Sequence, residues 1–180
     1  RLCAECRLGA RCSRWEAWGS VRIALRLGGT CWSGRRALDV WGEWGDRGRV
    51  VGLAGHTNLK VLRLQADEFT PSAVVTGPDG REALIDAAPQ ILVGSDGMVE
   101  LCRRPEVDLV VVATAGEAGL LPTLAALESG KLVALATKET LVAAGPVIKA
   151  ALHSGAGRLG PITSEHSAIG HGVPCEPGGA

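Results

Sequence analysis

The middle of this chain alternates short apolar runs with longer stretches that have helical periodicity. Near-continuous apolar runs are typical of strands that are buried on both faces of a parallel sheet. Connecting stretches of about ten to fifteen residues are typical of the crossover helices that join such strands. The alternation therefore predicts one α/β domain built on a parallel sheet.

The expected elements follow directly from this pattern. Strands are expected at residues 21–27, 49–54, 73–76, 90–93, 107–113, 132–136 and 158–163. Helices are expected at residues 35–44, 59–68, 80–88, 96–104, 120–129 and 146–154. The predicted fold class is α/β, a Rossmann-like, doubly wound and mostly parallel sheet with helices on both faces.

Charge and hydropathy exclude two classes of partner. The chain has 180 residues, and its 19 basic residues balance 19 acidic ones. A nucleic acid or an anionic membrane surface needs a cationic field that this balance does not supply. The longest apolar stretches, residues 109–113 and 131–136, are far shorter than the roughly 20 residues that span a bilayer. Since no secretory signal is visible near Arg1, the cytosol is the expected compartment.

Composition divides the chain into three parts. All five tryptophans lie between residues 15 and 44, and half of the six cysteines lie in the first twelve residues. We expect a leader of unclear structure at 1–20, one domain at 21–169 and a tail at 170–180. Cys3, Cys6 and Cys12 are an alternative zinc site, but no fourth Cys or His follows at the usual spacing.

In a parallel sheet, ligands bind beyond the carboxyl ends of the strands, so the residues there are the candidate site. The turn at 28–34 reads Gly-Gly-Thr-Cys-Trp-Ser-Gly, which resembles an imperfect dinucleotide fingerprint. Such a turn directs backbone N–H groups at phosphates, although Cys31 stands where a side chain crowds the pyrophosphate. The alternative is a plain connection from a strand to a helix.

The next strand is followed by His56, Thr57 and Asn58, without the carboxylate that usually accepts the ribose hydroxyls of NAD. With Lys60 nearby, this favours a 2′-phosphate and therefore NADP. An ordinary helix N-cap by Thr57 or Asn58 explains the same residues equally well.

Two later strands also end in polar residues. A lysine at the position of Lys138 can hold a substrate oxygen, although Lys138 and Glu139 also suit a surface pair at the start of a helix. Glu165 suits Mg²⁺ or Mn²⁺, which prefer oxygen ligands, although Ser164 and Glu165 also suit a helix start.

Three segments resemble one known enzyme family. They are Gly-Glu-Ala-Gly-Leu-Leu-Pro-Thr-Leu at 116–124, Ala-Thr-Lys-Glu-Thr-Leu-Val at 136–142 and Ser-Glu-His-Ser-Ala-Ile at 164–169. In this order and spacing they resemble 1-deoxy-D-xylulose 5-phosphate reductoisomerase, and the resemblance covers residues 20–169. It argues against a generic Rossmann dehydrogenase.

The resemblance implies the NADPH-binding half of an enzyme of non-mevalonate isoprenoid synthesis. That enzyme rearranges and reduces 1-deoxy-D-xylulose 5-phosphate to 2-C-methyl-D-erythritol 4-phosphate with NADPH and Mn²⁺ or Mg²⁺. It also implies a sugar phosphate substrate, a homodimer, and a location in the bacterial cytoplasm or a plastid.

The resemblance further assigns roles to individual residues. The cofactor-binding residues it implies are Gly28, Thr30, Ser33, Gly34, His56, Thr57, Asn58, Thr137 and Glu139. Lys138, Ser164 and Glu165 are the implied substrate-binding residues; Lys138 and Glu165 are also the implied catalytic residues, and Glu165 the implied metal ligand.

Several departures from the family pattern bear on activity. The family turn reads Gly-Ser-Thr-Gly-Ser-Ile-Gly, Thr137 replaces an Asn, and Thr163 replaces a metal-binding Asp. The family's catalytic domain does not follow residue 169, so we expect the cofactor fold with little or no turnover. The alternative is a non-catalytic dinucleotide-binding or dimerisation module. Residues 1–20 and 170–180 match nothing in the family and fit GC-rich DNA read out of frame.

Overall fold

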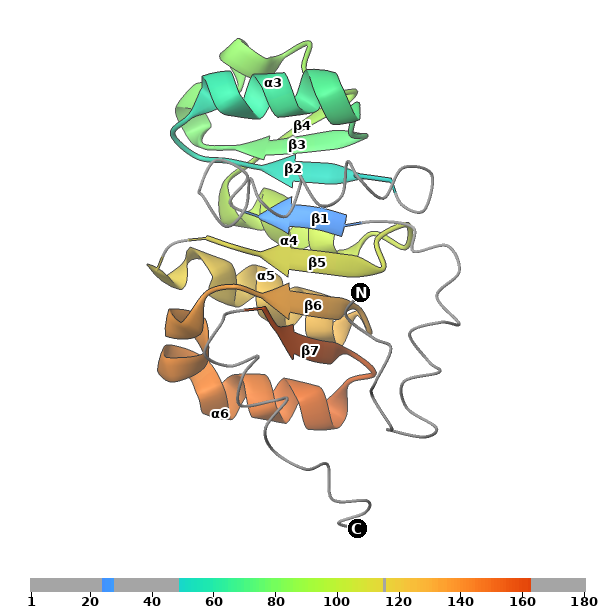
Figure 1. The fold of residues 1–180 in the computed structure, drawn as a ribbon, viewed down its shortest axis with the longest axis vertical. Coiled ribbons are helices and arrows are strands. Elements are labelled where there is room, and N and C mark those ends of the chain that lie inside the picture. The colour runs from blue at the N-terminus through green and yellow to red at the C-terminus, as the bar shows by residue number, and fades with distance from the viewer. Residues whose placement is uncertain (1–23, 28–48, 115, 163–180) are drawn as a thin grey trace, which may run out of the picture.

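The computed structural model describes residues 24–27, 49–114 and 116–162 of the chain. Its centre is a seven-stranded sheet in the order β4-β3-β2-β1-β5-β6-β7, with every pairing parallel (Figure 1). The strands are β1 (Ala24–Leu27), β2 (Gly52–Ala54), β3 (Ala73–Thr76), β4 (Gln90–Val93), β5 (Leu109–Val112), β6 (Leu132–Leu135) and β7 (Arg158–Pro161). The expected parallel sheet is confirmed.

The order of the strands shows how the chain is wound. From β1 the chain adds β2, β3 and β4 outward on one side, and then crosses back to place β5 on the other side of β1. In the central pair, Leu27 lies opposite Val112. The winding direction therefore reverses between β1 and β5, which is the switch point of a Rossmann-like, doubly wound sheet.

Helices cover both faces of the sheet, and the side chains of β2 and β3 alternate between the two faces. Leu53 and Val74 belong to a buried cluster with α3 (Leu59–Phe69), whereas Ala54 and Val75 belong to a second, larger cluster. The larger cluster includes residues of α4 (Gly94–Arg103), α5 (Leu120–Glu128) and α6 (Lys138–Ser154). Burial on both faces explains why the strands read as continuous apolar runs.

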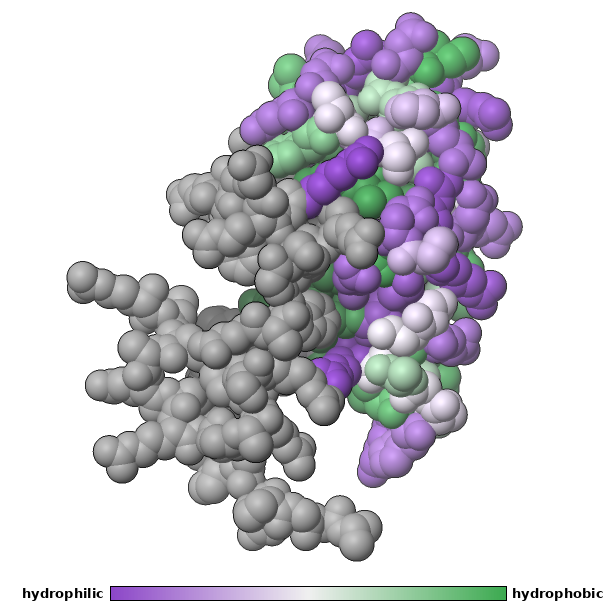
Figure 2. All heavy atoms as spheres, turned by 90° about the vertical axis from the view of Figure 1, so that its right-hand side faces the viewer, coloured by the Kyte–Doolittle hydropathy of each residue, from purple (hydrophilic) through white to green (hydrophobic). Residues whose placement is uncertain are grey.

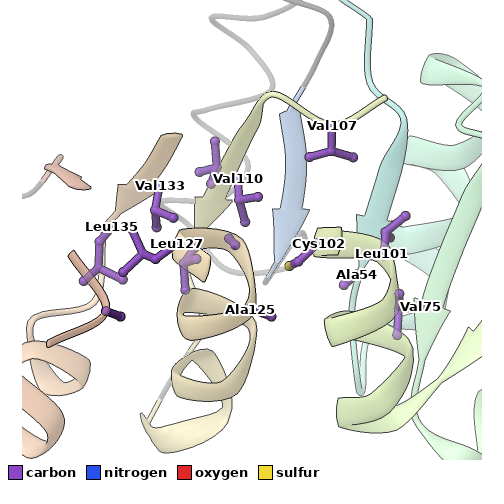
Figure 3. Close-up of a cluster of buried hydrophobic side chains, with 14 of the residues drawn as sticks. Ala54, Val75, Leu101, Cys102, Val107, Val110, Ala125, Leu127, Val133 and Leu135 are labelled. Carbon is purple, nitrogen blue, oxygen red and sulfur yellow. The ribbon is translucent and has the colours of Figure 1, made fainter. Parts of the chain in front are cut away.

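The larger cluster is the main core of the described part. Figure 3 shows Leu101 and Cys102 of α4 and Ala125 and Leu127 of α5 gathered beside Val110 of β5. All five side chains are buried, with no more than 3% of each exposed. Burial raises the pKa of the Cys102 thiol to about 12, although the positive charges of Arg103 and Lys131 oppose the shift.

Two expected helices differ from the structure. The helix expected at 80–88 is wrong: the segment forms two single turns of 3-10 helix, η2 (Pro78–Gly80) and η3 (Glu82–Leu84). Its backbone bonds join residues three apart, as in Ala87 N to Leu84 O at 2.8 Å, because this short connection must return between two adjacent strands.

The helix expected at 146–154 is too short, because α6 begins at Lys138. Ala144 has non-helical backbone angles (φ −131°, ψ 22°), and Pro146 follows two residues later. Proline lacks the amide that would bond the carbonyl one turn earlier, so the helix kinks there without ending. The helix expected at 35–44, the leader at 1–20 and the tail at 170–180 lie outside the described residues.

Within those described ranges, no helix combines the length and the apolar character needed to cross a membrane.

The Cys102 thiol predicts a specific loss of stability at alkaline pH. Its pKa is 9.0 in the unfolded chain and about 12 in the folded state, so between these values only the unfolded chain releases the proton. The free energy of unfolding therefore falls by up to about 1.4 kcal/mol per pH unit above pH 9. Urea unfolding from pH 8 to 10.5 measures it, with Cys102→Ala as the control that lacks this contribution. Parallel pH curves for the two proteins would contradict the prediction.

Candidate functional site

The amino edge of the sheet is a polar surface whose charges are paired with one another. This edge faces the viewer in Figure 2 and is largely hydrophilic. The Arg104 guanidinium lies 3.3 Å from a Glu100 oxygen and 3.9 Å from a Glu106 oxygen, and it also bonds Gln90. Lys131 Nζ donates to the Arg104 carbonyl at 2.8 Å. These side chains therefore have partners within the domain itself.

The carboxyl edge differs, because buried hydroxyls there have no partner. Thr76 ends β3, Thr114 follows β5 and Thr140 lies in the first turn of α6. The Oγ1 atom of each is buried and makes no hydrogen bond within the described part of the chain. A buried hydroxyl without a partner is costly, so each of these three groups needs an explanation, such as an ordered water molecule.

Two of these hydroxyls face one small space between β5 and α6. A Cβ atom added to Gly119 would lie 2.5 Å from Thr114 Oγ1 and 3.5 Å from Thr140 Oγ1. Thr137 Oγ1 donates to the Thr114 carbonyl at 2.9 Å, which ties the end of β5 to the start of α6. Gly119 must therefore lack a side chain for this junction to close.

The start of α6 carries two residues singled out in the sequence. Lys138 is the first helical residue, and Glu139 follows it with an exposed side chain. Thr137 is the N-cap residue and is buried. Since its hydroxyl bonds the chain itself, Thr137 supports the site from within rather than through a free hydroxyl group.

The end of β2 carries the second group of expected site residues. His56, Thr57 and Asn58 are all exposed. Asn58 is the N-cap of α3, and its Oδ1 accepts from Val61 N at 3.2 Å. Of the two N-cap candidates, Asn58 is thus the N-cap residue, while the His56 side chain is exposed at the carboxyl edge.

Several expected site residues fall outside the described ranges. They are Gly28, Thr30, Ser33, Gly34, Thr163, Ser164 and Glu165, together with Cys3, Cys6 and Cys12. Among the residues that are described, no three His, Cys, Asp or Glu side chains gather in a way that could hold a metal ion.

The sequence analysis assigned no site role to Thr76, Thr114 and Thr140, or to two glycines at the carboxyl edge, Gly77 and Gly119. Thr76 and Thr114 lie at the ends of apolar runs, so the rule that selects residues after strands could have found them. Thr140 and the glycines are recognisable only from packing.

The family model of 1-deoxy-D-xylulose 5-phosphate reductoisomerase matches residues 24–145, more than half of the chain. The chain belongs to the 1-deoxy-D-xylulose 5-phosphate reductoisomerase family. Proteins with this name from Gloeobacter violaceus and Nostoc punctiforme are 39% and 41% identical over 154 and 156 residues. These matches cover 82% and 83% of this chain but 39% of each relative, so the chain spans about two-fifths of their length.

Solved reductoisomerase structures share the fold. The enzyme from Zymomonas mobilis in complex with NADPH is 34% identical, with a TM-score of 0.80 over 86% of this chain and 42% of that one. A reductoisomerase in complex with NADPH, fosmidomycin and magnesium gives a TM-score of 0.81 at 34% identity, over 86% of this chain and 39% of that one. A biliverdin reductase from Synechocystis, 21% identical with a TM-score of 0.55, shares the fold alone.

The bond from Thr137 to the Thr114 carbonyl predicts a measurable contribution to stability. Thr137→Val keeps the shape of the side chain but removes the donor, so we expect a loss of about 1–2 kcal/mol in the free energy of unfolding. Urea unfolding measures the loss. Thr137→Ser keeps the hydroxyl and is expected to lose less. A larger loss for the serine variant would assign the role of Thr137 to methyl packing instead.

Proposed function

We propose that this chain is the NADPH-binding part of a reductoisomerase that acts on 1-deoxy-D-xylulose 5-phosphate. The product is 2-C-methyl-D-erythritol 4-phosphate, in non-mevalonate isoprenoid synthesis. The observation that carries the proposal is the family match over residues 24–145, which includes the carboxyl edge of the sheet with His56 and the start of α6. Solved relatives in complex with NADPH support the choice of cofactor.

The residues at this edge fit a dinucleotide. His56 follows β2 without a neighbouring carboxylate at 55–58, which favours a 2′-phosphate over free ribose hydroxyls. Gly116, with φ at +64°, opens the turn after β5, and a Cβ there would meet no atom of the described chain within 4 Å. The buried hydroxyls of Thr114 and Thr140 lie next to Gly119 in the same region.

Each end of the cofactor thus has candidate partners in this chain. We assign the adenosine end to His56, Thr57 and Asn58, and the phosphates to the turn that holds Gly28, Thr30, Ser33 and Gly34. Thr137 and Glu139 lie at the remaining end, where α6 starts. NADPH would supply the hydride that reduces the substrate. Glu139 would contact the cofactor through its side chain, whereas Thr137, whose hydroxyl bonds the Thr114 carbonyl, would hold the start of α6 in place.

We assign substrate binding to Lys138, Ser164 and Glu165. Lys138 is the first residue of α6, and a lysine ammonium group can hold a substrate oxygen by a charge-assisted hydrogen bond. Glu165 is the proposed ligand of Mn²⁺ or Mg²⁺, with the neutral Thr163 in place of the family's aspartate. Because a threonine hydroxyl is a weaker ligand for a hard cation than a carboxylate, we expect weak metal binding by this chain.

The proposal also covers the domain bounds, the oligomeric state and the cellular location. We propose a cofactor domain at 21–169, association as a homodimer, and a location in a bacterial cytoplasm, with a plastid as the second choice. A non-catalytic dinucleotide-binding or dimerisation module is the second candidate function. One observation favours it: Thr163 stands where the family resemblance implies a metal-binding aspartate.

Binding of NADPH tests the proposal directly. A ligand that binds only the folded state raises its stability, by about 2.7 kcal/mol at a concentration one hundred times the Kd. We expect thermal unfolding of the 180-residue chain to shift upward with NADPH and much less with NADH. An unchanged melting temperature in a folded sample would overturn the proposal. Equal shifts of the melting temperature with NADPH and NADH would contradict the assignment of His56 to the 2′-phosphate.

Turnover distinguishes the two candidate functions. With 1-deoxy-D-xylulose 5-phosphate, NADPH and Mn²⁺, we expect little or no oxidation of NADPH, since the metal site lacks the family's aspartate. Turnover at a rate that dialysis against a chelator abolishes would instead favour the complete enzyme activity over the binding module.

A further inference from the structure

The histidine at the end of β2 lies against the neighbouring strand. Parallel pairing places Ala54 opposite Val75, and Gly55 N continues the ladder with a bond to Val75 O at 3.0 Å. Two residues further along, the same register brings His56 beside Gly77. Both residues therefore lie at the carboxyl edge, where β2 and β3 end.

Gly77 is a glycine that its own backbone does not require. Its angles, φ −68° and ψ 167°, are those of an extended residue that any amino acid adopts. The nearest atoms to an added Cβ would all be ring atoms of His56: Nε2 at 3.1 Å, Cδ2 at 3.2 Å and Cε1 at 3.5 Å. The space that a side chain at 77 would fill is thus occupied by the His56 imidazole.

From this contact we infer that Gly77 is a positioning residue, which holds the His56 ring where it binds the 2′-phosphate of NADPH and so favours NADPH over NADH. The inference rests on the proposed function. An exposed histidine samples several rotamers, and fixing it before the ligand arrives reduces the entropy that binding must offset. The ring lies against a backbone that carries no side chain, with Nε2 as its nearest atom, and an imidazole N–H can donate to a phosphate oxygen.

The neighbouring polar residues support this division of roles. Asn58 already uses its side chain to cap α3, so it is held in place by the helix start. Lys60, an exposed residue of α3, follows His56 by four positions and adds positive charge without contact to Gly77. His56 is therefore the residue whose position depends on Gly77.

A substitution at Gly77 separates positioning from stability. In Gly77→Ala the new Cβ is too close to the ring, but His56 is exposed and can turn away into solvent. Alanine also fits the backbone angles and restricts the unfolded chain, which stabilises the fold. We therefore expect the melting temperature of Gly77→Ala to be unchanged or raised while NADPH binding weakens.

The experiment is a double-substitution cycle on the 180-residue chain, with NADPH and NADH titrated by calorimetry. We expect Gly77→Ala to raise the Kd for NADPH about fivefold and His56→Ala about tenfold, with NADH changed less than about twofold. In the His56→Ala background, Gly77→Ala should add less than about 1.5-fold, because the two residues act through one contact. Gly145→Ala, at a glycine with open space around it, is the matched control and should leave both Kd values unchanged.

The outcomes separate this inference from the proposed function. If the unaltered chain binds no NADPH, the proposed function is overturned and the inference with it. If the unaltered chain prefers NADPH, three results would overturn the inference alone: equal weakening of NADPH and NADH by Gly77→Ala, additive effects of the two substitutions, or a lowered melting temperature.

Discussion

The parallel pairing of β1 with β5 determines where everything else in this domain can lie. Parallel strands cannot be joined by tight turns, so each connection must cross the sheet and return to the amino edge. Since the chain runs outward from β1 in one direction and from β5 in the other, α3 covers one face and α4, α5 and α6 the other. The carboxyl ends of the strands then lie at one edge of the sheet (Figure 1).

The two edges of the sheet differ in how their polar groups are hydrogen-bonded. At the amino edge, Arg104 and Lys131 find partners within the domain, so those groups are satisfied whether or not anything binds. At the carboxyl edge, the Oγ1 atoms of Thr76, Thr114 and Thr140 are buried but unpaired within the described residues. This asymmetry is what distinguishes a binding edge from a supporting one, and it agrees with family membership without depending on it.

The sequence predicts the fold well where one physical cause dominates. The runs at 73–76 and 90–93 match β3 and β4 residue for residue, because both are rich in the branched apolar residues that favour strands. Of the two, β3 is buried throughout, whereas β4 at the sheet edge is partly exposed. Helix prediction fails where backbone geometry overrides periodicity. The segment at 80–88 is too constrained by its two strand ends to form a regular helix, and Pro146 conceals the first half of α6.

The candidate site follows a similar division. Residues that come after strands, such as His56 and Lys138, are visible in the sequence, because the sheet requires polar positions at its carboxyl edge. The contact between His56 and Gly77 is not visible, since it depends on the register of two strands that are joined by a helix. Thr140 is hidden for a related reason: only the packing of α6 near Gly119 makes its hydroxyl distinctive.

The kink at Ala144 divides α6 into two helical segments. The second segment carries Ile148 and Ala151, which are buried in the core, while the first segment begins at Lys138 and Glu139. In a straight helix, a shift of the residues packed in the core would also displace the first turn. Because the helix is interrupted at Ala144, a shift of Ile148 or Ala151 in the core is transmitted less directly to the first turn at Lys138 and Glu139.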